Sequence, residues 1–484
     1  MTMATQALTD LPKGCLIDGR WVATDAALPV IDPSDGAVFA EIAAGGPREI
    51  VAAVAAARRA ADGGAWSRLT ATERGRLLTR LGAAIAAHAE RLAALESRDT
   101  GKPLAQACAD LAATARYFEY YGGAADKVHG ETIPFLAGYT VQTWREAHGV
   151  TGHIIPWNYP AQIFGRSLAP ALAMGNATVL KPAEEASLTP LAIAALALEA
   201  DFPPGAINVV TGEGTSAGAA LAAARGVDFL SFTGSPQVGT LVQTSAARNH
   251  IGCTLELGGK SPQILFEDAD LDRAIPSLVA AVIQNGGQTC SAGSRALVHC
   301  PIYDRVAARL AARFAELVAA PSAEDRDLGP LISAAQRRRV EAYVDRARPP
   351  LMARGRIAAS APPGGFYVAP ALYGPALADD ELAQEELFGP ILTMIPFQDE
   401  AEAVRVANCT EYGLVAGVWT ENAARQMRVA KALRCGQVFL NGYGAGGGIE
   451  LPFGGVRKSG HGREKGFAAL HEFSQLKTVV LHHG

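Results

Sequence analysis

The spacing of apolar residues changes several times along the chain. Residues 15–45 contain two short extended runs with turn signals at Gly19-Arg20 and at residues 32–36, which predicts antiparallel hairpins. From residue 48 to about residue 128, Ala, Leu and Val recur three and four positions apart with charged residues between them, which is typical of amphipathic helices. Residues 138–147 alternate again and indicate an exposed strand whose edge needs a partner.

From Gly149 onward, short apolar runs alternate with helical segments. Five runs follow this pattern, at residues 153–156, 177–180, 206–210, 229–232 and 254–257. The alternation predicts a parallel sheet covered by helices on both faces, with ligands at the carboxyl ends of its strands.

A second α/β region begins near Gln263. Its expected extended runs are residues 263–266, 295–299, 391–396 and 413–419, and its expected helices are residues 271–284, 303–319, 334–346, 399–407 and 422–433. Residues 475–482 form a last alternating strand. Because the chain shows no fixed-period repeat and no low-complexity linker, we expect its domains to be tightly docked.

The length and the charge of the chain limit the classes of protein that it can belong to. With 484 residues the chain exceeds what one hydrophobic core supports, so two or three domains are expected. A net charge of −5 with interspersed signs argues against binding to nucleic acid or to an anionic membrane surface. Residues 1–10 lack a signal-peptide pattern, and no stretch is long and apolar enough to span a bilayer.

Cysteine and histidine usage indicates the redox compartment and argues against a metal site. Seven cysteines without framework spacing predict reduced thiols in the cytoplasm. The ten histidines form no His-Glu-x-x-His pattern and the cysteines no paired Cys-x-x-Cys pattern, so we expect no metal site.

One cysteine differs from the others in its surroundings. Cys290 lies in a turn of small and polar residues, 284–295, where glycines allow a substrate carbonyl to approach closely. The alternative is that Cys290 is a small buried hydrophobe, as free cysteines usually are. The remaining six lie in or beside apolar or helical runs: Cys15, Cys108, Cys253, Cys300, Cys409 and Cys435. Cys290 is therefore the candidate nucleophile.

Two polar residues in apolar surroundings are candidate partners of this thiol. Asn158 lies in the turn Pro156-Trp157-Asn158-Tyr159-Pro160, and its amide can donate to a developing oxyanion or simply bond nearby backbone. Glu256 ends an apolar run that opens into glycines, where burial would raise its pKa and make it a usable general base. An ordinary buried, hydrogen-bonded glutamate is the alternative.

Phosphate-binding patterns are present but individually weak. In residues 232–239, Ser235 and Pro236 predict a helix start whose free N–H groups suit a pyrophosphate, with plain helix capping as the equal alternative. Lys181 and Glu184 follow another strand and suit the hydroxyls of a ribose, although a solvated charge pair is the simpler interpretation. Two glycine patterns, at residues 212–217 and 442–447, imitate the dinucleotide fingerprint without its full context.

Taken together, six motifs in sequence order resemble the aldehyde dehydrogenase superfamily from Leu16 to the C-terminus. They are Pro156 to Pro160, Phe232 to Ser235, Leu255 to Lys260, Gly287 to Arg295, Glu385 to Pro390, and Pro452 to Gly455. The resemblance implies NAD-dependent, non-acylating oxidation of an aldehyde to a carboxylic acid, with NADP as a further possible cofactor. It assigns Cys290 as nucleophile, Asn158 with the Cys290 backbone N–H as oxyanion donors, and Glu256 as the base that activates water.

The resemblance also assigns residues to the cofactor. These are Ile154, Pro156, Trp157, Lys181, Glu184, Gly214, Phe232, Gly234, Ser235, Leu257, Glu386 and Phe388. Within this set, the Glu184 carboxylate favours NAD because it would repel a 2′-phosphate.

The implied fold is α/β with three parts. A Rossmann-type dinucleotide-binding domain would comprise residues 1–125 and 147–258, an α/β catalytic domain residues 259–458, and a β oligomerisation segment residues 126–146 and 459–484. The strand near Tyr139 to Arg145 would be joined by the C-terminal strand, and each C-terminal strand would extend a neighbour's sheet, giving a homodimer or homotetramer.

Departures from the family concern the substrate. Many relatives carry Trp-Lys where this chain has Arg166-Ser167, and the loop 442–448 has almost no side chains. We expect a roomy tunnel for bulky or aromatic aldehydes. Its predicted wall residues are Tyr159, Ile163, Phe164, Thr289, Ser291 and Tyr443. A semialdehyde or aminoaldehyde dehydrogenase, a coenzyme A-acylating relative and a non-catalytic member stay open, and the sequence does not reveal the physiological aldehyde.

Overall fold

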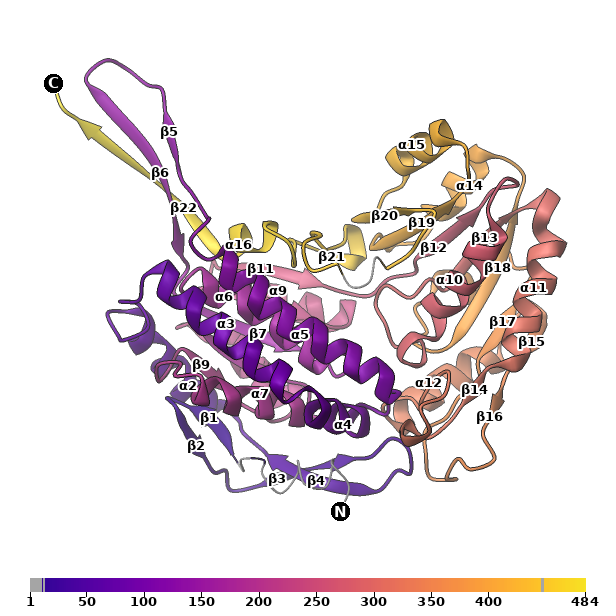
Figure 1. Ribbon diagram of the computed structural model, residues 1–484, viewed down its shortest axis with the longest axis horizontal. Helices are drawn as coiled ribbons and strands as arrows, with labels where there is room; N and C mark the ends of the chain where they lie inside the picture. The colour runs from indigo at the N-terminus through magenta and orange to yellow at the C-terminus, as the bar shows by residue number, and fades with distance from the viewer. Residues whose placement is uncertain (1–10, 12–13, 445–447) are drawn as a thin grey trace.

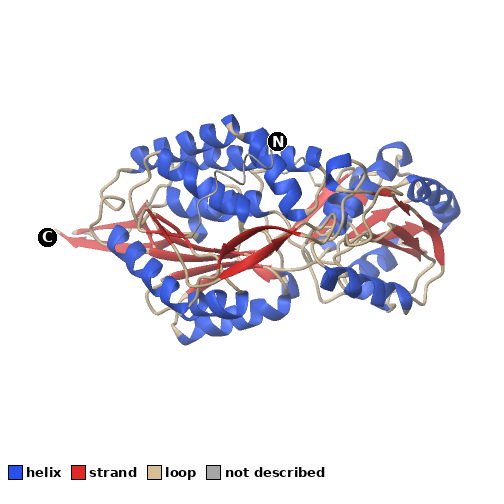
Figure 2. Cartoon of the chain, turned by 90° about the horizontal axis from the view of Figure 1, so that it is seen from below, coloured by secondary structure: helices blue, strands red, loops and turns tan. Residues whose placement is uncertain are grey.

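The computed structural model describes residues 11, 14–444 and 448–484, and places them in two α/β bodies and a projecting β arm. Figure 1 shows the first body in indigo to magenta, the second in pink to orange, and the arm at the upper left. In Figure 2, helices lie above and below the strands of both bodies. This is the helix-covered α/β layering that the alternating pattern predicts.

The first body is built on an eight-stranded sheet with the order β2-β1-β9-β8-β7-β10-β11-β21. The strands β9, β8, β7, β10 and β11 are parallel, whereas β1 and β21 pair antiparallel with β9 and β11, and β2 pairs antiparallel with β1. The strands are β1 (Cys15–Ile17), β2 (Arg20–Val22), β7 (Val150–Ile155), β8 (Ala177–Pro182), β9 (Ile207–Val209), β10 (Phe229–Thr233), β11 (Gly252–Glu256) and β21 (Gly460–His461). A separate hairpin, β3 (Ala27–Ile31) with β4 (Val38–Ala43), lies below it in Figure 1. The parallel sheet and the N-terminal hairpins confirm the expectation from the sequence.

Helices cover this sheet, most with an apolar face toward it. They are α2 (Pro47–Ala61), α3 (Ala71–Ala87), α4 (Ala89–Thr100), α5 (Leu104–Ala124), α6 (Pro160–Ala173), α7 (Leu188–Glu199), α8 (Ala219–Ala223) and α9 (Pro236–Arg248). Of these, α6 and α7 are buried on almost every side. Thr70 and Glu73 form a capping box at the start of α3. Helix α6 packs between β7 and β8 on one side and α5 on the other, which fixes the face that it turns toward the second body.

The second body contains a seven-stranded sheet with the order β15-β17-β18-β13-β12-β19-β20. Only β15 is antiparallel. The strands are β12 (Pro262–Leu265), β13 (Arg295–His299), β15 (Leu351–Arg354), β17 (Ala371–Tyr373), β18 (Ile391–Phe397), β19 (Val415–Trp419) and β20 (Gln437–Leu440), and a small pair joins β14 (Val318–Ala319) to β16 (Arg356–Ile357). The helices are α10 (Leu271–Ile283), α11 (Tyr303–Glu316), α12 (Ala334–Asp345), α13 (Glu381–Gln384), α14 (Glu400–Ala407) and α15 (Ala423–Ala432).

The prediction of where one helix ends is wrong. Residues 303–319 were expected to be one helix, but α11 ends at Glu316 and the next residues form β14. Leu317 has extended backbone angles and its side chain is buried, so pairing of β14 with β16 replaces the last helical turn.

The arm is a three-stranded antiparallel sheet formed by β5 (Glu131–Ile133), β6 (Tyr139–Ala147) and β22 (Ser474–His482). Strands β6 and β22 pair along their full length, from Ala147 with Ser474 to Tyr139 with His482. The two exposed strands predicted at residues 138–147 and 475–482 therefore pair with each other within one chain.

Residues 460–473 belong to the first body, although the sequence placed them with the arm. Strand β21 pairs with β11, and α16 (Ala468–Glu472) leads to Phe473, which is fully buried in the core of the first body. The division of the chain into domains remains an interpretation, and these contacts favour starting the C-terminal part of the arm at Ser474.

Candidate active site

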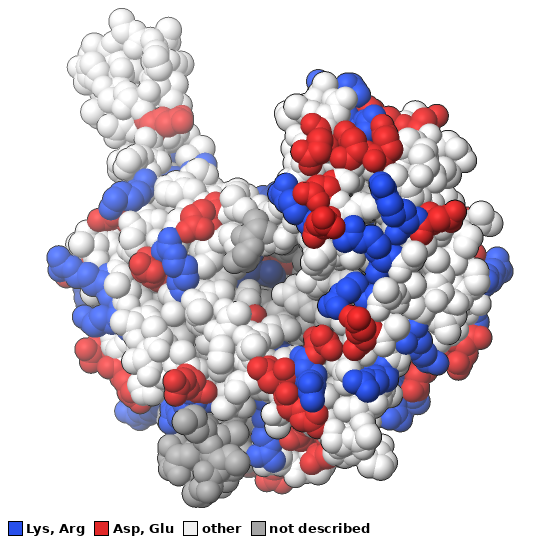
Figure 3. Space-filling model, turned by 45° about the vertical axis from the view of Figure 1, so that its right-hand side comes forward, with Lys and Arg blue, Asp and Glu red and all other residues white. Residues whose placement is uncertain are grey.

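A cavity of about 370 Å³ lies between the two bodies. Figure 3 shows the molecule hollowed between them, with charges of both signs interspersed over most of that face. The walls come from the turn between β7 and α6, the start of α9, the end of β11, and the loop before β13. Carboxyl ends of β7, β10 and β11 meet here, as expected for a ligand site of a parallel sheet.

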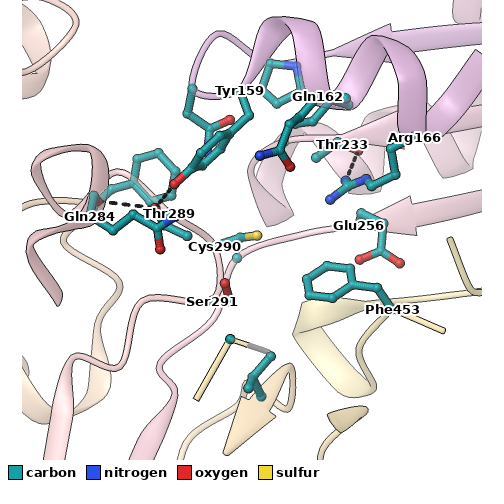
Figure 4. A pocket seen from close by; sticks show the side chains of 18 of the residues that line it. Tyr159, Gln162, Arg166, Thr233, Glu256, Gln284, Thr289, Cys290, Ser291 and Phe453 are labelled. Carbon is teal, nitrogen blue, oxygen red and sulfur yellow. Dashed lines mark hydrogen bonds between the residues drawn. The ribbon is translucent and has the colours of Figure 1, made fainter. Parts of the chain in front are cut away.

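Cys290 reaches this cavity because the loop before it has a backbone that few residues tolerate. Asn285, Gly286 and Gly287 have φ values of 51°, 64° and 77°. A side chain at Gly287 would collide with the backbone of Gly389. The loop can therefore pack against the second body and turn the thiol toward the first (Figure 4).

The surroundings of Cys290 favour the neutral thiol. Burial raises the pKa of Cys290 to about 11, while the nearby Arg166 guanidinium opposes that shift. Among the described residues, no group accepts a hydrogen bond from the Cys290 backbone N–H. Hydrogen bonds of the fold among the described residues thus leave this N–H unused.

Asn158 is held against the cysteine loop by hydrogen bonds in both directions. Its Nδ2 donates to the Gln288 carbonyl at 2.9 Å, and its own carbonyl accepts from Asn285 Nδ2 at 2.8 Å. Its Oδ1 is buried without a partner among the described residues. The amide is therefore held against the loop that carries Cys290.

Glu256 is a buried carboxyl group at the end of β11. It is 2 % exposed, and neither of its oxygens has a hydrogen-bond partner within the described part of the chain. Burial raises its pKa well above the ordinary value, and Glu464 adds to that shift. An unpartnered carboxyl group facing the same cavity as a thiol is costly for stability, which points to a chemical use.

The predicted cofactor residues occupy two neighbouring regions. Ser235 caps α9 by accepting from Val238 N–H at 3.3 Å, and Pro236 is the first helical residue. At the end of β8, Glu184 pairs with Lys181 and accepts from Gly214 N–H at 3.0 Å. The Lys181 ammonium lowers the Glu184 pKa against the opposing effect of burial, so the carboxylate stays charged.

The other region lies in the cavity between the two bodies. Trp157 and Phe388 meet edge to face with ring centroids 5.5 Å apart. Glu386 Oε1 accepts from Gly259 N–H at 2.9 Å, and burial raises the Glu386 pKa to about 7. These side chains line the cavity together with Pro156, Gly234 and Ser235.

Comparison with known proteins identifies the family. The model of the aldehyde dehydrogenase family matches residues 21–479. The chain belongs to the aldehyde dehydrogenase family.

Among its relatives, benzaldehyde dehydrogenase, mitochondrial, from Antirrhinum majus is 40% identical over 478 residues, 96% of this chain and 88% of that protein. A solved structure of a putative aldehyde dehydrogenase from Burkholderia cenocepacia is 58% identical, with a TM-score of 0.96 over 97% of this chain and 100% of that one. The NAD+ complex of aldehyde dehydrogenase from Bacillus cereus is 36% identical, with a TM-score of 0.97 over 100% of this chain and 99% of that one.

The cavity of this aldehyde dehydrogenase contains most of the residues predicted to bind substrate. Tyr159, Ile163, Thr289, Ser291 and Tyr443 all line it. Tyr159 Oη and Thr289 Oγ1 are 2.7 Å apart, and Tyr443 Oη donates to the Ser291 carbonyl at 2.6 Å. Of the glycine-rich loop, residues 445–447 lie outside the described part, so the expectation of an open entrance there stays a prediction.

The prediction for Phe164 is wrong. Phe164 is fully buried and packs on Phe118 of α5, with ring centroids 6.2 Å apart. Each helical residue turns about 100° from the last, so the neighbour of pocket-lining Ile163 faces the opposite packing partner.

Several predicted cofactor residues support the cavity without lining it. Ile154, Phe232 and Leu257 pack in the core of the first body, and the Phe232 ring lies directly beneath Gly234. Lys181, Glu184 and Gly214 form the separate strand-end cluster described above.

Several lining residues were not predicted from the sequence. They include Gln162, Arg166, Gln284, Gln336, Arg339, Gln437, Phe439, Leu451, Phe453 and Lys465. Phe453 lay within a recognised motif, and Arg166 was noted only as a departure. Gln162 and Lys465 carry no local signal, because their exposure to the cavity depends on how the two bodies dock.

Proposed function

We propose that this member of the family oxidises an aldehyde to a carboxylic acid with NAD, using Cys290 as the nucleophile and Glu256 as the base. The observation that carries the proposal is the shared cavity. A thiol from the second body, a carboxyl group from β11 and an amide from the β7–α6 turn face one space, although 132 residues separate Asn158 from Cys290 in the chain (290 − 158).

The residues of the cofactor side fit NAD. The capped start of α9 offers N–H groups to a pyrophosphate, and Lys181 with Glu184 suits the hydroxyls of an adenosine ribose. Trp157, Glu386 and Phe388 would border the nicotinamide end. The charged Glu184 carboxylate favours NAD over NADP, which remains a possible second cofactor. NAD, when bound, supplies the acceptor for the hydride that leaves the aldehyde carbon.

The chain's own residues would then perform the remaining steps. The Cys290 thiolate attacks the carbonyl carbon, and the oxygen of the thiohemiacetal accepts from the Asn158 amide and the Cys290 N–H. Loss of hydride leaves a thioester on Cys290. Glu256 takes a proton from water as that water attacks the thioester, and the Cys290 sulfur leaves as the carboxylic acid forms.

The substrate class that we favour is bulky or aromatic aldehydes. Phe439, Phe453 and Tyr443 provide apolar and aromatic walls beside Cys290. The relative from Antirrhinum majus is named for benzaldehyde, which agrees with this choice.

A semialdehyde dehydrogenase is the second candidate. Arg166 and Lys465 both line the cavity, and each lies over the Phe453 ring, at 5.4 and 5.3 Å from its centroid. Arg166 also pairs with Glu464, so the two cations favour a carboxylate-bearing aldehyde over an aminoaldehyde only with part of their charge. A coenzyme A-acylating activity is disfavoured because Glu256 is placed for hydrolysis.

The test is a steady-state assay with NAD and with NADP across aliphatic, amino, dicarboxylic-semialdehyde and aromatic aldehydes. The measured quantity is nicotinamide absorbance, and Cys290→Ala is the control. We expect NAD reduction with aromatic aldehydes that disappears in the variant. Turnover confined to short aliphatic aldehydes would contradict the substrate class, and a folded protein without any turnover would contradict the reaction.

We further propose a homodimer or homotetramer in the cytoplasm. The arm exposes large apolar side chains, including Trp144, Leu476, Val480 and Leu481. The seven free cysteines suit a reducing compartment. Within residues 14–444 and 448–484, no helix has the length and apolarity needed to cross a membrane.

A further inference from the structure

Gln162 is the polar side chain that α6 presents to the cavity one turn before Arg166 (Figure 4). It is half-buried, and its neighbour Ile163 also lines the cavity with an apolar side chain. An amide in this place has two chemically different ends, so its orientation decides what it can recognise.

A buried group of charges lies behind Gln162, away from the cavity. This charged triad consists of Glu96, Lys102 and Asp110, each at most 2 % exposed. Lys102 Nζ lies 2.8 Å from Glu96 Oε1 and 2.6 Å from Asp110 Oδ2. Burial lowers the Lys102 pKa, but the two carboxylates together raise it above its ordinary value, so the side chain remains an ammonium.

The charged triad also fixes the start of α6. Glu96 Oε2 accepts from Ala161 N–H at 3.1 Å, and Lys102 Nζ lies 4.6 Å from the centre of the Tyr159 ring. The segment just before Gln162 is therefore anchored to the first body by a buried charge–dipole contact and a cation–π contact.

Asp110 determines which end of the Gln162 amide faces the substrate. Gln162 Nε2 donates to Asp110 Oδ1 at 2.8 Å. Because a carboxylate only accepts hydrogen bonds, the amide nitrogen must be the atom bound to Asp110. The carbonyl Oε1 lies on the Arg166 side of the amide in Figure 4, and no described residue donates to it.

We propose that Gln162 is a specificity-determining residue that selects aldehydes carrying a hydroxyl group on the body of the molecule. The inference rests on the proposed function. A hydroxyl donates to the fixed Gln162 oxygen, whereas an unsubstituted ring removes water from that oxygen and leaves it unpaired. Asp110 acts as a positioning residue, because it sets the direction of the amide without contacting substrate.

The experiment compares kcat/KM for benzaldehyde, the three hydroxybenzaldehydes and the matching methoxybenzaldehydes. The proteins are the wild type, Gln162→Leu, Ile163→Leu and Asp110→Asn. Each variant is assayed on the same substrates, so differences in intrinsic reactivity cancel when hydroxyl-to-hydrogen ratios are compared between proteins. Ile163→Leu is the matched control, because it reshapes the same wall without touching the amide.

In the wild type we expect at least one hydroxy isomer to exceed its methoxy analogue by about tenfold, the size of one well-placed hydrogen bond. Gln162→Leu should bring the hydroxyl-to-methoxy ratio close to one while benzaldehyde is still oxidised, and Ile163→Leu should keep the preference. In Asp110→Asn, the new amide can donate to Gln162 Oε1 and so turn the Gln162 amide around. Its nitrogen would then face the substrate, so the preference should move toward the methoxy compounds.

Equal hydroxyl-to-methoxy ratios in the wild type and in Gln162→Leu would overturn the role of Gln162 and leave the proposed function intact. Failure of the wild type to oxidise any aldehyde would instead overturn the proposed function. Melting curves separate these results from misfolding, and Gln162→Leu supplies the test if Asp110→Asn does not fold.

Discussion

At the scale of single residues, burial shifts the pKa of the proposed nucleophile and that of the proposed base in the same direction. Both groups lie in a cavity that disfavours charge, so Cys290 and Glu256 each have a raised pKa. In the protein without ligands, the thiol is therefore kept in its neutral form near pH 7, and the Glu256 carboxyl group holds a proton more readily than an exposed glutamate does. Binding of the cofactor or the substrate must therefore lower the Cys290 pKa before the thiolate can attack quickly.

The raised Cys290 pKa predicts slow and strongly pH-dependent alkylation of the free enzyme. Below a pKa of about 11, each unit of pH raises the thiolate fraction about tenfold. The rate of inactivation by iodoacetamide should therefore still be rising between pH 7 and pH 9. A plateau in that range, with Cys290→Ala as the background, would show that the thiol is already ionised.

Replacement of the base should separate the two halves of the reaction. Glu256→Gln keeps the size of the side chain but cannot take a proton from water, so acylation should proceed and thioester hydrolysis should slow by about 10²–10⁴-fold. Stopped-flow measurements should show a burst of NADH followed by a slow steady state. A loss of the burst would mean that Glu256 acts before the thioester forms.

The proposed catalytic residues could be selected from the sequence because each lies within a contiguous motif whose local chemistry is visible. Gln162 could not be selected in this way, because the role of its side chain depends on the hydrogen bond to Asp110, 52 residues away, and on the docking of the second body. Lys465 could not be selected from the sequence either, because the chain after β21 must fold back before this residue reaches the cavity.

At the scale of elements, α6 shows where sequence periodicity helps and where it fails. Its apolar and small residues predicted a helix, and the structure confirms one from Pro160 to Ala173. The helix is buried on almost every side, so its pattern does not reveal which face meets the cavity. Phe164 was assigned to the substrate for that reason, although its side chain packs on α5.

The charged triad joins α4 and α5 to α6, and removal of its cation should destabilise the first body. Lys102→Met leaves Glu96 and Asp110 buried without their counter-charge, which should cost about 3–5 kcal/mol. The measurement is the urea midpoint followed by circular dichroism. Lys458→Met, which removes an exposed pair with Glu411, is the matched control and should barely change that midpoint. Equal effects of the two variants would contradict the stabilising role of the triad.

At the scale of the whole molecule, the two bodies and the arm have separate tasks. Sheet order explains why the site lies between the bodies: β11 brings Glu256 to the edge of the first body, and the chain crosses directly to β12 of the second. The arm contributes no residue to the cavity lining. Its exposed apolar strands are available for assembly.

A charge on the arm should weaken that assembly without changing the site. Val480 on β22 is 55 % exposed and pairs with Val141 of β6. Val480→Lys would place an ammonium on the expected contact between subunits, so the mass measured by light scattering should fall toward 50.3 kDa at low protein concentration. Gln475→Lys, at the other end of β22 where it pairs with Glu146, is a control for added charge alone. An unchanged mass for Val480→Lys would argue that this part of the arm is outside the contact.

The late position of β21 and Phe473 in the chain has a consequence for biosynthesis. These residues close the β11 edge and the core of the first body, yet the ribosome makes them only after the whole sheet of the second body. During translation, the first sheet keeps an unpaired edge while 179 further residues, from β12 to β20, are made and fold (440 − 262 + 1). A nascent chain that stops within the second body would therefore present an unprotected strand to its neighbours on the polysome, where chaperones would be needed most.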